Sequence, residues 1–306
     1  MRARYQRFAE AEARGRSPLY EALALGVAQD AEALAFLATL PPAKQQPNLL
    51  FAALQHVCGT ARDYQHFRTL LRANRDAVRA VMMQRRTQTN EPARCAVLIP
   101  VMAQLPQPLA LIEVGASAGL CLLMDRYGYD YGGHVLAGTP CFSCRTNSQT
   151  PIPDAAPVIA WRAGLDLAPI DVTDDTTTAW LETLVWPEQT DRLTRLRAAI
   201  AVARQEPPLL VKADLDDLPH LAAQAPRDAT LVVYHSAVLG CVESEKREAF
   251  AHLVRQLGAV WISNEGVGPE MADAPSGAFL LSLDSQPVAW TDPHGAWIEY
   301  ISLGLR

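Results

Sequence analysis

Four residues of one short run have the chemical character of a ligand site. The run LALIEVGASAGLCLLMD, residues 109–125, contains Glu113, Gly115, Ser117 and Gly119. Residues 109–114 are apolar except for Glu113, which predicts a buried parallel strand. The small residues from Gly115 to Gly119 let backbone N–H groups at the start of a following helix approach a ligand closely. The run therefore predicts a strand, a ligand-binding turn and a helix. The alternative is a scaffold turn that binds nothing.

The charge of this turn indicates which ligand it suits. The pyrophosphate of NAD prefers a G-x-G-x-x-G turn, whereas this run offers only Gly115 and Gly119, and the carboxylate of Glu113 repels phosphate. An acidic residue followed by G-x-x-x-G suits a ligand with a cationic amino-acid end. Here the sequence resembles the first motif of the Rossmann-like S-adenosylmethionine-dependent methyltransferases. The resemblance implies that S-adenosylmethionine binds along residues 113–119, Ser117 included.

The same turn also reads G-x-S-x-G, the nucleophile elbow of α/β-hydrolases. In this second interpretation Ser117 is the nucleophile, His235 or His294 is its base, and Asp214 orients the base. It is the weaker one, because the hydrolase fold needs earlier strands to supply an oxyanion N–H and no convincing strand precedes residue 109. A third interpretation is a non-catalytic Rossmann-like binding module.

Length and composition set the class of protein. With 306 residues, 49% hydrophobic and 20% charged, the chain can bury a large core in one large or two modest domains. The start has no apolar signal region and no run is long enough to span a membrane, so we expect a cytoplasmic protein without a membrane partner. Six scattered cysteines do not resemble a disulfide framework. Cys141 and Cys144 form a C-x-x-C, but only His134 lies near as a further ligand, so no metal is expected.

Charge is distributed unevenly along the chain. Residues 1–106 carry 14 Lys and Arg against 8 Asp and Glu, and residues 107–306 carry 13 against 25. A net charge of −6 argues against a general nucleic-acid binder. Five arginines follow helical spacing in a helix predicted over residues 63–86: Arg68, Arg72, Arg75, Arg79 and Arg86. They either dock an anion or the acidic half of the chain, or form a solvated face.

Periodicity predicts two regions. Residues 1–106 read as all-helical, a region that we expect to act as a lid. Residues 107–306 read as a Rossmann-like, doubly wound, mostly parallel α/β sheet with antiparallel C-terminal edge strands. The strands are expected at residues 109–114, 158–162, 209–213, 230–234, 259–263, 278–283, 288–290 and 297–302, with helices over 93–104 and 117–127 and a Gly-, Pro- and polar-rich insertion over 129–157.

Acidic and basic residues at predicted strand ends complete the candidate site. In doubly wound sheets an acid after the second strand binds ribose, so Asp166 is the first candidate and Asp171 the second, with helix capping as the alternative. The methyltransferase pattern places Asp214 near adenine. His235 and Glu265 follow the next two strands, and we expect His235 to be the catalytic base and Glu265 a second base or an acceptor-orienting group. Alternatively, His235 is a hydrogen-bonded loop residue and Glu265 a cap.

Several longer runs identify the family. These are SPLYEALA, QPNLLFAAL, QTNEPARC, LIEVGASAGL, RAGLDLAPIDVTD, LVWPEQTDRLTRLRAAIAVAR, LVVYHSAVL and TDPHGAWIEY. Together they resemble one bacterial family known as a domain of unknown function. The resemblance covers nearly the whole chain and implies a methyltransferase-like Rossmann fold behind a helical N-terminal region, acting on a small-molecule acceptor that the sequence does not name. The polar residues 88–91 within QTNEPARC are read as helix-cap chemistry.

Overall fold

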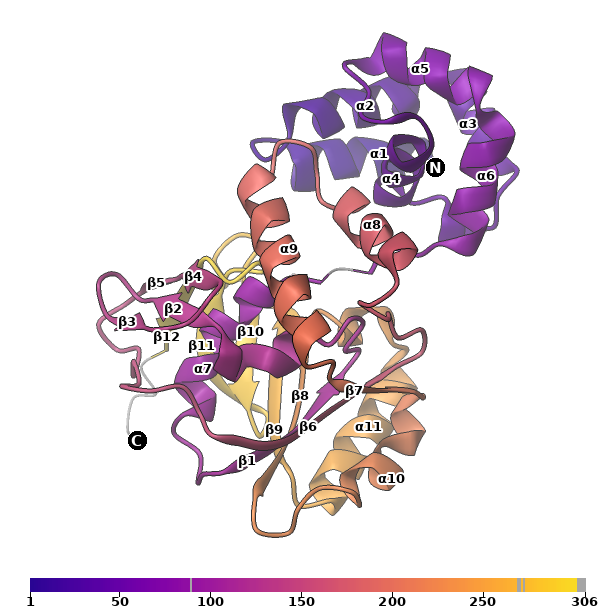
Figure 1. Cartoon of the computed structure of the whole chain (residues 1–306). Coiled ribbons are helices and arrows are strands. Elements are labelled where there is room, and N and C mark those ends of the chain that lie inside the picture. Colours follow the sequence, from indigo (N-terminus) through magenta and orange to yellow (C-terminus); the bar gives the residue numbers. More distant parts are fainter. Residues whose placement is uncertain (89, 269–270, 272, 302–306) are drawn as a thin grey trace. The chain divides into compact units, whose positions relative to one another are not determined.

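The chain forms two compact units. A computed structural model describes residues 1–88, 90–268, 271 and 273–301. One unit comprises Met1–Thr89 with Asp174–Thr194, and the other comprises Asn90–Thr173 with Arg195–Arg306 (Figure 1). We call them the helical unit and the α/β unit. Two predicted features include positions outside the described residues, Thr89 in the polar run and Ser302 in the last strand.

The helical unit has no strand among its described residues, as the sequence predicts. Its helices are α1 (Arg2–Arg7), η1 (Phe8–Ala13), α2 (Pro18–Gln29), α3 (Ala31–Ala38), η2 (Pro42–Lys44), α4 (Pro47–Cys58), α5 (Tyr64–Ala73), α6 (Arg75–Gln84) and α8 (Asp175–Thr183). The prediction of one long helix over residues 63–86 is wrong, because the chain breaks at Asn74. The side-chain amide and the backbone N–H of Asn74 both donate to the carbonyl of Leu70, which ends α5 there.

Aromatic packing holds the helical unit together. Phe51 of α4 is fully buried and makes edge-to-face contacts with Tyr5, Phe8, Tyr20 and Phe67, at ring-centroid distances of 5.0–6.2 Å. Such contacts add to the burial of apolar area, which is the main stabilising contribution. The unit therefore has a core of its own.

The segment 174–194 joins this core although it is distant in sequence. The indole N–H of Trp180 donates to the carbonyl of Arg86 at 2.9 Å, and that of Trp186 donates to Asn48 at 3.0 Å. The carboxylate of Glu188 accepts from the hydroxyl of Ser17 at 2.7 Å. The compact units thus differ from a simple division of the chain at residue 106, and the lid role stays a prediction.

The α/β unit is built on a nine-stranded sheet of order β5-β12-β11-β10-β9-β8-β1-β6-β7. Five of its strands, β7-β6-β1-β8-β9, are mutually parallel, and β10 to β12 add an antiparallel edge. The predicted fold class is confirmed. The strands are β1 (Leu109–Val114), β5 (Arg145–Thr146), β6 (Ile159–Asp166), β7 (Leu209–Lys212), β8 (Thr230–Ser236), β9 (Val260–Gly266), β10 (Phe279–Leu283), β11 (Gln286–Thr291) and β12 (Trp297–Tyr300).

Helices cover both faces of this sheet (Figure 1). On one face, Ile112 and Val233 pack with Leu221 of α10 (Leu218–Ala222) and Phe250 of α11 (Ser244–Gln256). The other face carries η4 (Leu120–Arg126), packed in turn against η3 (Pro92–Arg94) and α7 (Cys95–Met102). The order of the parallel strands reverses at β1, so the carboxyl ends of β1 and β8 form the switch point where doubly wound sheets bind ligands.

Some elements differ from their predicted form. The helix expected over residues 117–127 is the short 3-10 helix η4, with a kink at Leu123. The insertion predicted over 129–157 carries a small sheet of β2 (Gly128–Asp130), β3 (Val135–Leu136) and β4 (Cys141–Ser143). Strands β6, β8 and β9 end two to four residues later than predicted, so His235 and Glu265 lie inside strands.

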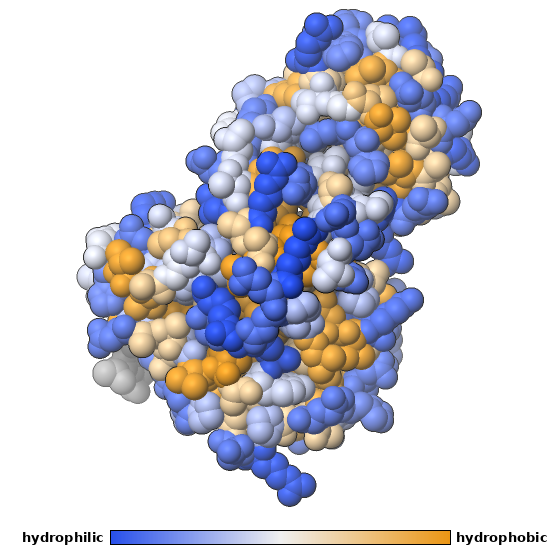
Figure 2. All heavy atoms as spheres, viewed as in Figure 1, coloured by the Kyte–Doolittle hydropathy of each residue, from blue (hydrophilic) through white to orange (hydrophobic). Residues whose placement is uncertain are grey.

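The described surface mixes polar and apolar side chains. In the face that Figure 2 shows, apolar residues occur in small groups between hydrophilic ones. No helix among the described residues is both long and apolar enough to span a bilayer.

Candidate functional site

The turn after β1 has the backbone shape that its glycines suggest. Gly115 and Gly119 adopt φ of 68° and 66°, and Ser117 adopts a φ of 53°, which is uncommon for a residue with a side chain. A Cβ atom added at Gly115 would lie 2.6 Å from Val238, and one at Gly119 would lie 2.7 Å from Pro208. Protein side chains therefore occupy the space that both glycines leave.

The backbone N–H groups of the turn all have protein acceptors. The N–H of Ser117 donates to the carboxylate of Asp166 at 2.8 Å, and that of Ala118 donates to the side-chain carbonyl of Asn90 at 3.0 Å. The other three N–H groups of residues 115–119 donate to backbone carbonyls. The side-chain amide of Asn90 also donates to the hydroxyl of Ser117 at 2.9 Å. The predicted ribose ligand Asp166 thus supports the turn itself, and its second oxygen accepts from the N–H of Ala168.

Glu113 is a buried acid at the end of the central strand. The residue is 8% exposed, and its Oε2 atom is buried without a hydrogen-bond partner. Burial raises the pKa of Glu113 well above its usual range, and the Asp166 carboxylate adds to this effect. The hydroxyl of Tyr234, the register partner of Glu113 on β8, and the guanidinium of Arg94 act in the opposite direction. Glu113 therefore favours its neutral, protonated form.

A second group of charged residues lies beside this acid. Arg94, almost fully buried, donates to the carbonyl of Pro293 at 2.8 Å and to that of Ser236 at 3.0 Å. These bonds bring the loop that carries His294 to the end of β8. Nδ1 of His294 lies 3.8 Å from Oε2 of Glu91, whose side chain is 1% exposed, whereas 37% of the His294 side chain is exposed. A buried carboxylate beside a partly exposed imidazole is an arrangement that can hold or move a proton.

The predicted base His235 is buried and hydrogen-bonded at both ring nitrogens. Its exposure is 0%, Nε2 accepts from the indole N–H of Trp261 at 3.0 Å, and Nδ1 lies 2.6 Å from Glu265. Because an indole only donates, the proton of the neutral ring sits on Nδ1. This geometry agrees with the alternative of a structural histidine and gives no support to His235 as the base.

Glu265 is held in a similar way. Its carboxylate accepts from His235 and from the backbone N–H groups of Val238 and Leu239. Burial acts to raise the pKa of Glu265, but these hydrogen bonds outweigh it and hold that pKa below its usual value. Glu265 thereby fixes the loop whose Val238 packs over Gly115. Its geometry is that of a cap.

His235 and Glu113 also point to opposite faces of the sheet. Glu113 is in register with Tyr234, so these two side chains share a face, and His235 points to the other one, against Phe250 of α11. Glu113 and His235 therefore both lie near the carboxyl ends of the parallel strands, but on opposite faces of the sheet, and they do not share a pocket.

The other two predicted acids, Asp214 and Asp171, make hydrogen bonds to residues outside the turn. Asp214 accepts from the N–H of Leu215 at 2.7 Å and pairs with Lys246 at 3.0 Å, so it caps η5 (Leu215–Asp217). Hydrogen bonds to Leu215 and Lys246 lower its pKa. Asp171 accepts from Thr173 and borders a groove of 260 Å³ next to the turn. The groove is lined mainly by apolar residues: Ala118, Pro169, Ile170, Val172, Pro207, Pro208 and Leu210.

The C-x-x-C motif and its neighbour make local contacts. Cys141 is exposed and Cys144 is buried, both as free thiols, and His134 contacts the carbonyl of Pro153. Across the described ranges, no three His, Cys, Asp or Glu side chains are grouped so as to hold a metal ion.

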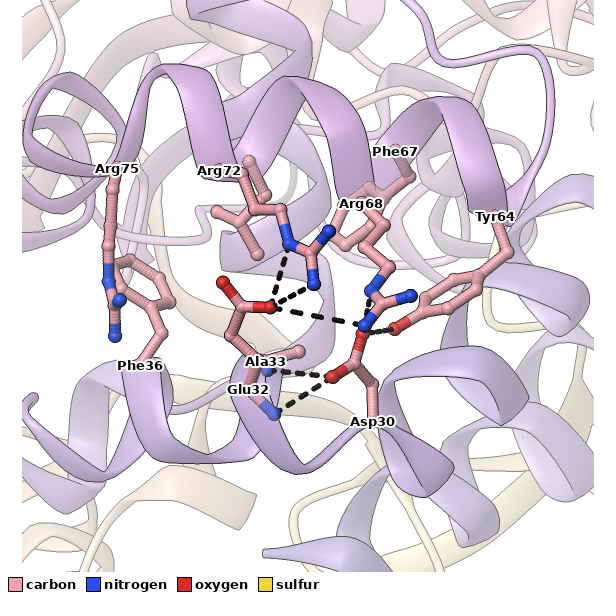
Figure 3. A pocket seen from close by; sticks show the side chains of 10 residues that line it. Asp30, Glu32, Ala33, Phe36, Tyr64, Phe67, Arg68, Arg72 and Arg75 are labelled. Carbon is pink, nitrogen blue, oxygen red and sulfur yellow. Dashed lines mark hydrogen bonds and ion pairs between the residues drawn. The ribbon is translucent and has the colours of Figure 1, made fainter.

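The arginine series lies within the helical unit, and Figure 3 shows Arg68, Arg72 and Arg75 next to α3 and its N-cap residue Asp30. Three of the arginines line a small pocket there, together with Asp30 and Glu32. The contacts are Arg68 with Asp30 at 2.9 Å, Arg72 with Glu32 at 2.7 Å, Arg75 over the ring of Phe36 at 5.4 Å, and Arg79 with Thr39 at 2.6 Å. These four side chains therefore connect α5 and α6 to α3.

The fold and the site define a Rossmann-like α/β protein with an acidic end on its central strand. Residues 2–300 match a family described as "Uncharacterized protein conserved in bacteria (DUF2332)", so the chain belongs to this family. The family predicted from the sequence runs is confirmed, and membership names no reaction. A search of curated proteins finds no match.

Sequence reasoning missed several residues that gather around Glu113. No role was predicted for Arg94 or Tyr234, and Asn90 and Glu91 were interpreted only as helix-capping residues. The alternation of side chains along strands could have predicted Tyr234, because residues in register on neighbouring parallel strands point to the same face of the sheet. Asn90, Glu91 and Arg94 lie together in the run QTNEPARC, but their approach to the turn is a tertiary contact that no local pattern encodes.

Proposed function

We propose that this protein binds S-adenosylmethionine at the carboxyl end of β1 and transfers its methyl group to a small molecule. The observation that carries the proposal is Glu113, a buried acid at the switch point with one oxygen that has no hydrogen-bond partner. A cationic ammonium group of a ligand would satisfy that oxygen and favour the ionised form. An anionic pyrophosphate brings no positive charge that would stabilise the ionised form of Glu113, so it is disfavoured as the anchored group.

The residues present fit such a cofactor only in part. Glu113 suits its ammonium group, whereas Asp166 and Asp214 already serve hydrogen bonds within the protein. The turn is also covered by Val238 and by Asn90. We therefore assign Glu113 as the anchoring residue and leave the ribose and adenine contacts unassigned.

Within this proposal, His294 is better placed than His235 to accept a proton from the acceptor. Its ring is partly exposed and lies beside the buried carboxylate of Glu91. A base must reach the reacting group, and a fully buried histidine with both nitrogens engaged does not.

Calorimetry on the pure protein tests the proposal. We expect heat with S-adenosylmethionine and S-adenosylhomocysteine and none with NAD. Because binding favours ionised Glu113, up to one proton should be released per ligand, measured in two buffers of different ionisation enthalpy. Glu113→Gln should abolish this release and weaken binding by about tenfold or more. Asp228→Asn, an exposed carboxylate of the same unit, is the matched control. Proton release unchanged in Glu113→Gln would refute the assignment of Glu113.

One observation favours the hydrolase alternative. Ser117 has a positive φ, as strained nucleophiles often do. However, the N–H of Ala118, which would belong to an oxyanion hole, is engaged by Asn90. A fluorophosphonate probe decides the matter, since labelling of the wild type but not of Ser117→Ala would favour the hydrolase. We expect no labelling.

A further inference from the structure

Asn90 is a polar side chain that reaches the turn from the segment before η3. The N–H groups of residues 115, 116, 117 and 119 are satisfied by β6, by Asp166 that ends it, or by the turn itself. The N–H of Ala118 and the hydroxyl of Ser117 are instead served by Asn90, which lies outside the sheet. Asn90 lies in an irregular segment between α6 and η3.

The chemistry of this contact defines what can replace it. The carboxamide of Asn90 accepts from Ala118 through Oδ1 and donates to Ser117 through Nδ2. It thus presents one acceptor and one donor side by side. A free amino acid end presents the same pair, since its carboxylate accepts and its ammonium donates. Glu113, whose Oε2 is buried without a hydrogen-bond partner, lies at the start of the same turn and would favour the ammonium group.

We propose that Asn90 is an internal competitor that occupies the position of a ligand's amino acid end and must leave the turn before the ligand binds. This inference rests on the proposed function, because it concerns access to the same site. A tethered side chain competes at a high effective concentration, so it weakens ligand binding without a second molecule. Removing it should strengthen binding, which is the opposite of what a ligand-contacting residue would show.

Calorimetry with S-adenosylhomocysteine on the full chain tests this. Asn90→Ala should bind about tenfold more tightly than the wild type, the scale of one or two net hydrogen bonds. Asn90→Ser has a side chain too short to reach Ala118 in the same way, so it should also bind more tightly than the wild type. It replaces Asn90→Ala as the test variant if the alanine variant folds poorly. Asn147→Ala is the matched control, because Asn147 also makes side-chain hydrogen bonds but contacts Thr150 and Tyr300. It should leave affinity unchanged.

Amide hydrogen exchange gives a second readout. The N–H of Ala118 should exchange faster in Asn90→Ala and regain protection when the ligand is added. Binding by Asn90→Ala alone, with a silent wild type, would support both proposals. Equal or weaker binding by both Asn90 variants would overturn the competitor role and leave the proposed function standing. Absence of binding by the wild type and both variants would overturn both.

Discussion

Replacing Glu113 by glutamine tests the electrostatics of the site without any ligand. Burial raises the pKa of Glu113 well above 4.5 in the folded protein, whereas the unfolded chain titrates near the usual value of about 4.3. Between these two pKa values the folded state keeps a proton that the unfolded state has released. The free energy of unfolding therefore falls by about 1.4 kcal/mol for each pH unit in this window. Below the window the contribution of Glu113 is fully present.

Glu113→Gln has no titrating group at this position, so its stability relative to the wild type should rise with pH. We expect the difference to grow by about 1.4 kcal/mol per unit from about pH 5 upward until Glu113 itself ionises. Urea unfolding followed by circular dichroism at a series of pH values measures it. Asp228→Asn should show no such trend. A difference between Glu113→Gln and wild type that stays constant from about pH 5 to about pH 8 would refute the raised pKa.

Three further substitutions probe the structure around the site. His235→Ala removes a buried side chain and one hydrogen bond from each of its partly buried partners, so it should lower the free energy of unfolding by about 3 kcal/mol in urea; a loss below about 1 kcal/mol would contradict a structural role of this histidine. Gly164→Ala places a Cβ 2.4 Å from that of Ala116 and should destabilise by about 1–3 kcal/mol, unlike Gly240→Ala, whose Cβ meets nothing within 4 Å. Asp30→Ala removes the N-cap of α3 together with the contacts of Asp30 to Tyr64 and Arg68, and should cost about 1 kcal/mol or more, seen as a lower melting temperature; no change would argue against all three contacts.

Local patterns were enough to predict the architecture. Alternation of apolar runs and helical periods after residue 109 predicted the doubly wound sheet, and the turn signals near its end predicted the antiparallel edge. The predicted helix over residues 63–86 failed because apolar periodicity continues through Asn74, while a side-chain hydrogen bond to Leu70 ends the helix there. Periodicity reports which face is buried and carries no information on such a break.

The site was harder to predict because its hydrogen bonds cross long sequence separations. Strand ends identified Glu113 and the turn correctly as neighbours of Asp166, but the sequence did not reveal that Asp166 would bond the N–H of Ser117. His235 was chosen for its chemistry at a strand end. The strand in fact continues to Ser236, and alternation turns the His235 side chain toward Phe250, away from Glu113.

The glycines of the turn show why packing and binding have to be separated by experiment. A small-residue turn after a strand permits close approach, and either a ligand or a protein side chain can make that approach. At Gly115 the approaching group is Val238, which Glu265 holds in place through a backbone hydrogen bond. At Ala118 it is the amide of Asn90. Oε2 of Glu113 is buried without a hydrogen-bond partner beside this turn, but the hydroxyls of Tyr5 and Tyr20 are buried in the same way inside the core of the helical unit. Proton release on binding separates the two cases, because only a bound cation would favour the ionised form of Glu113.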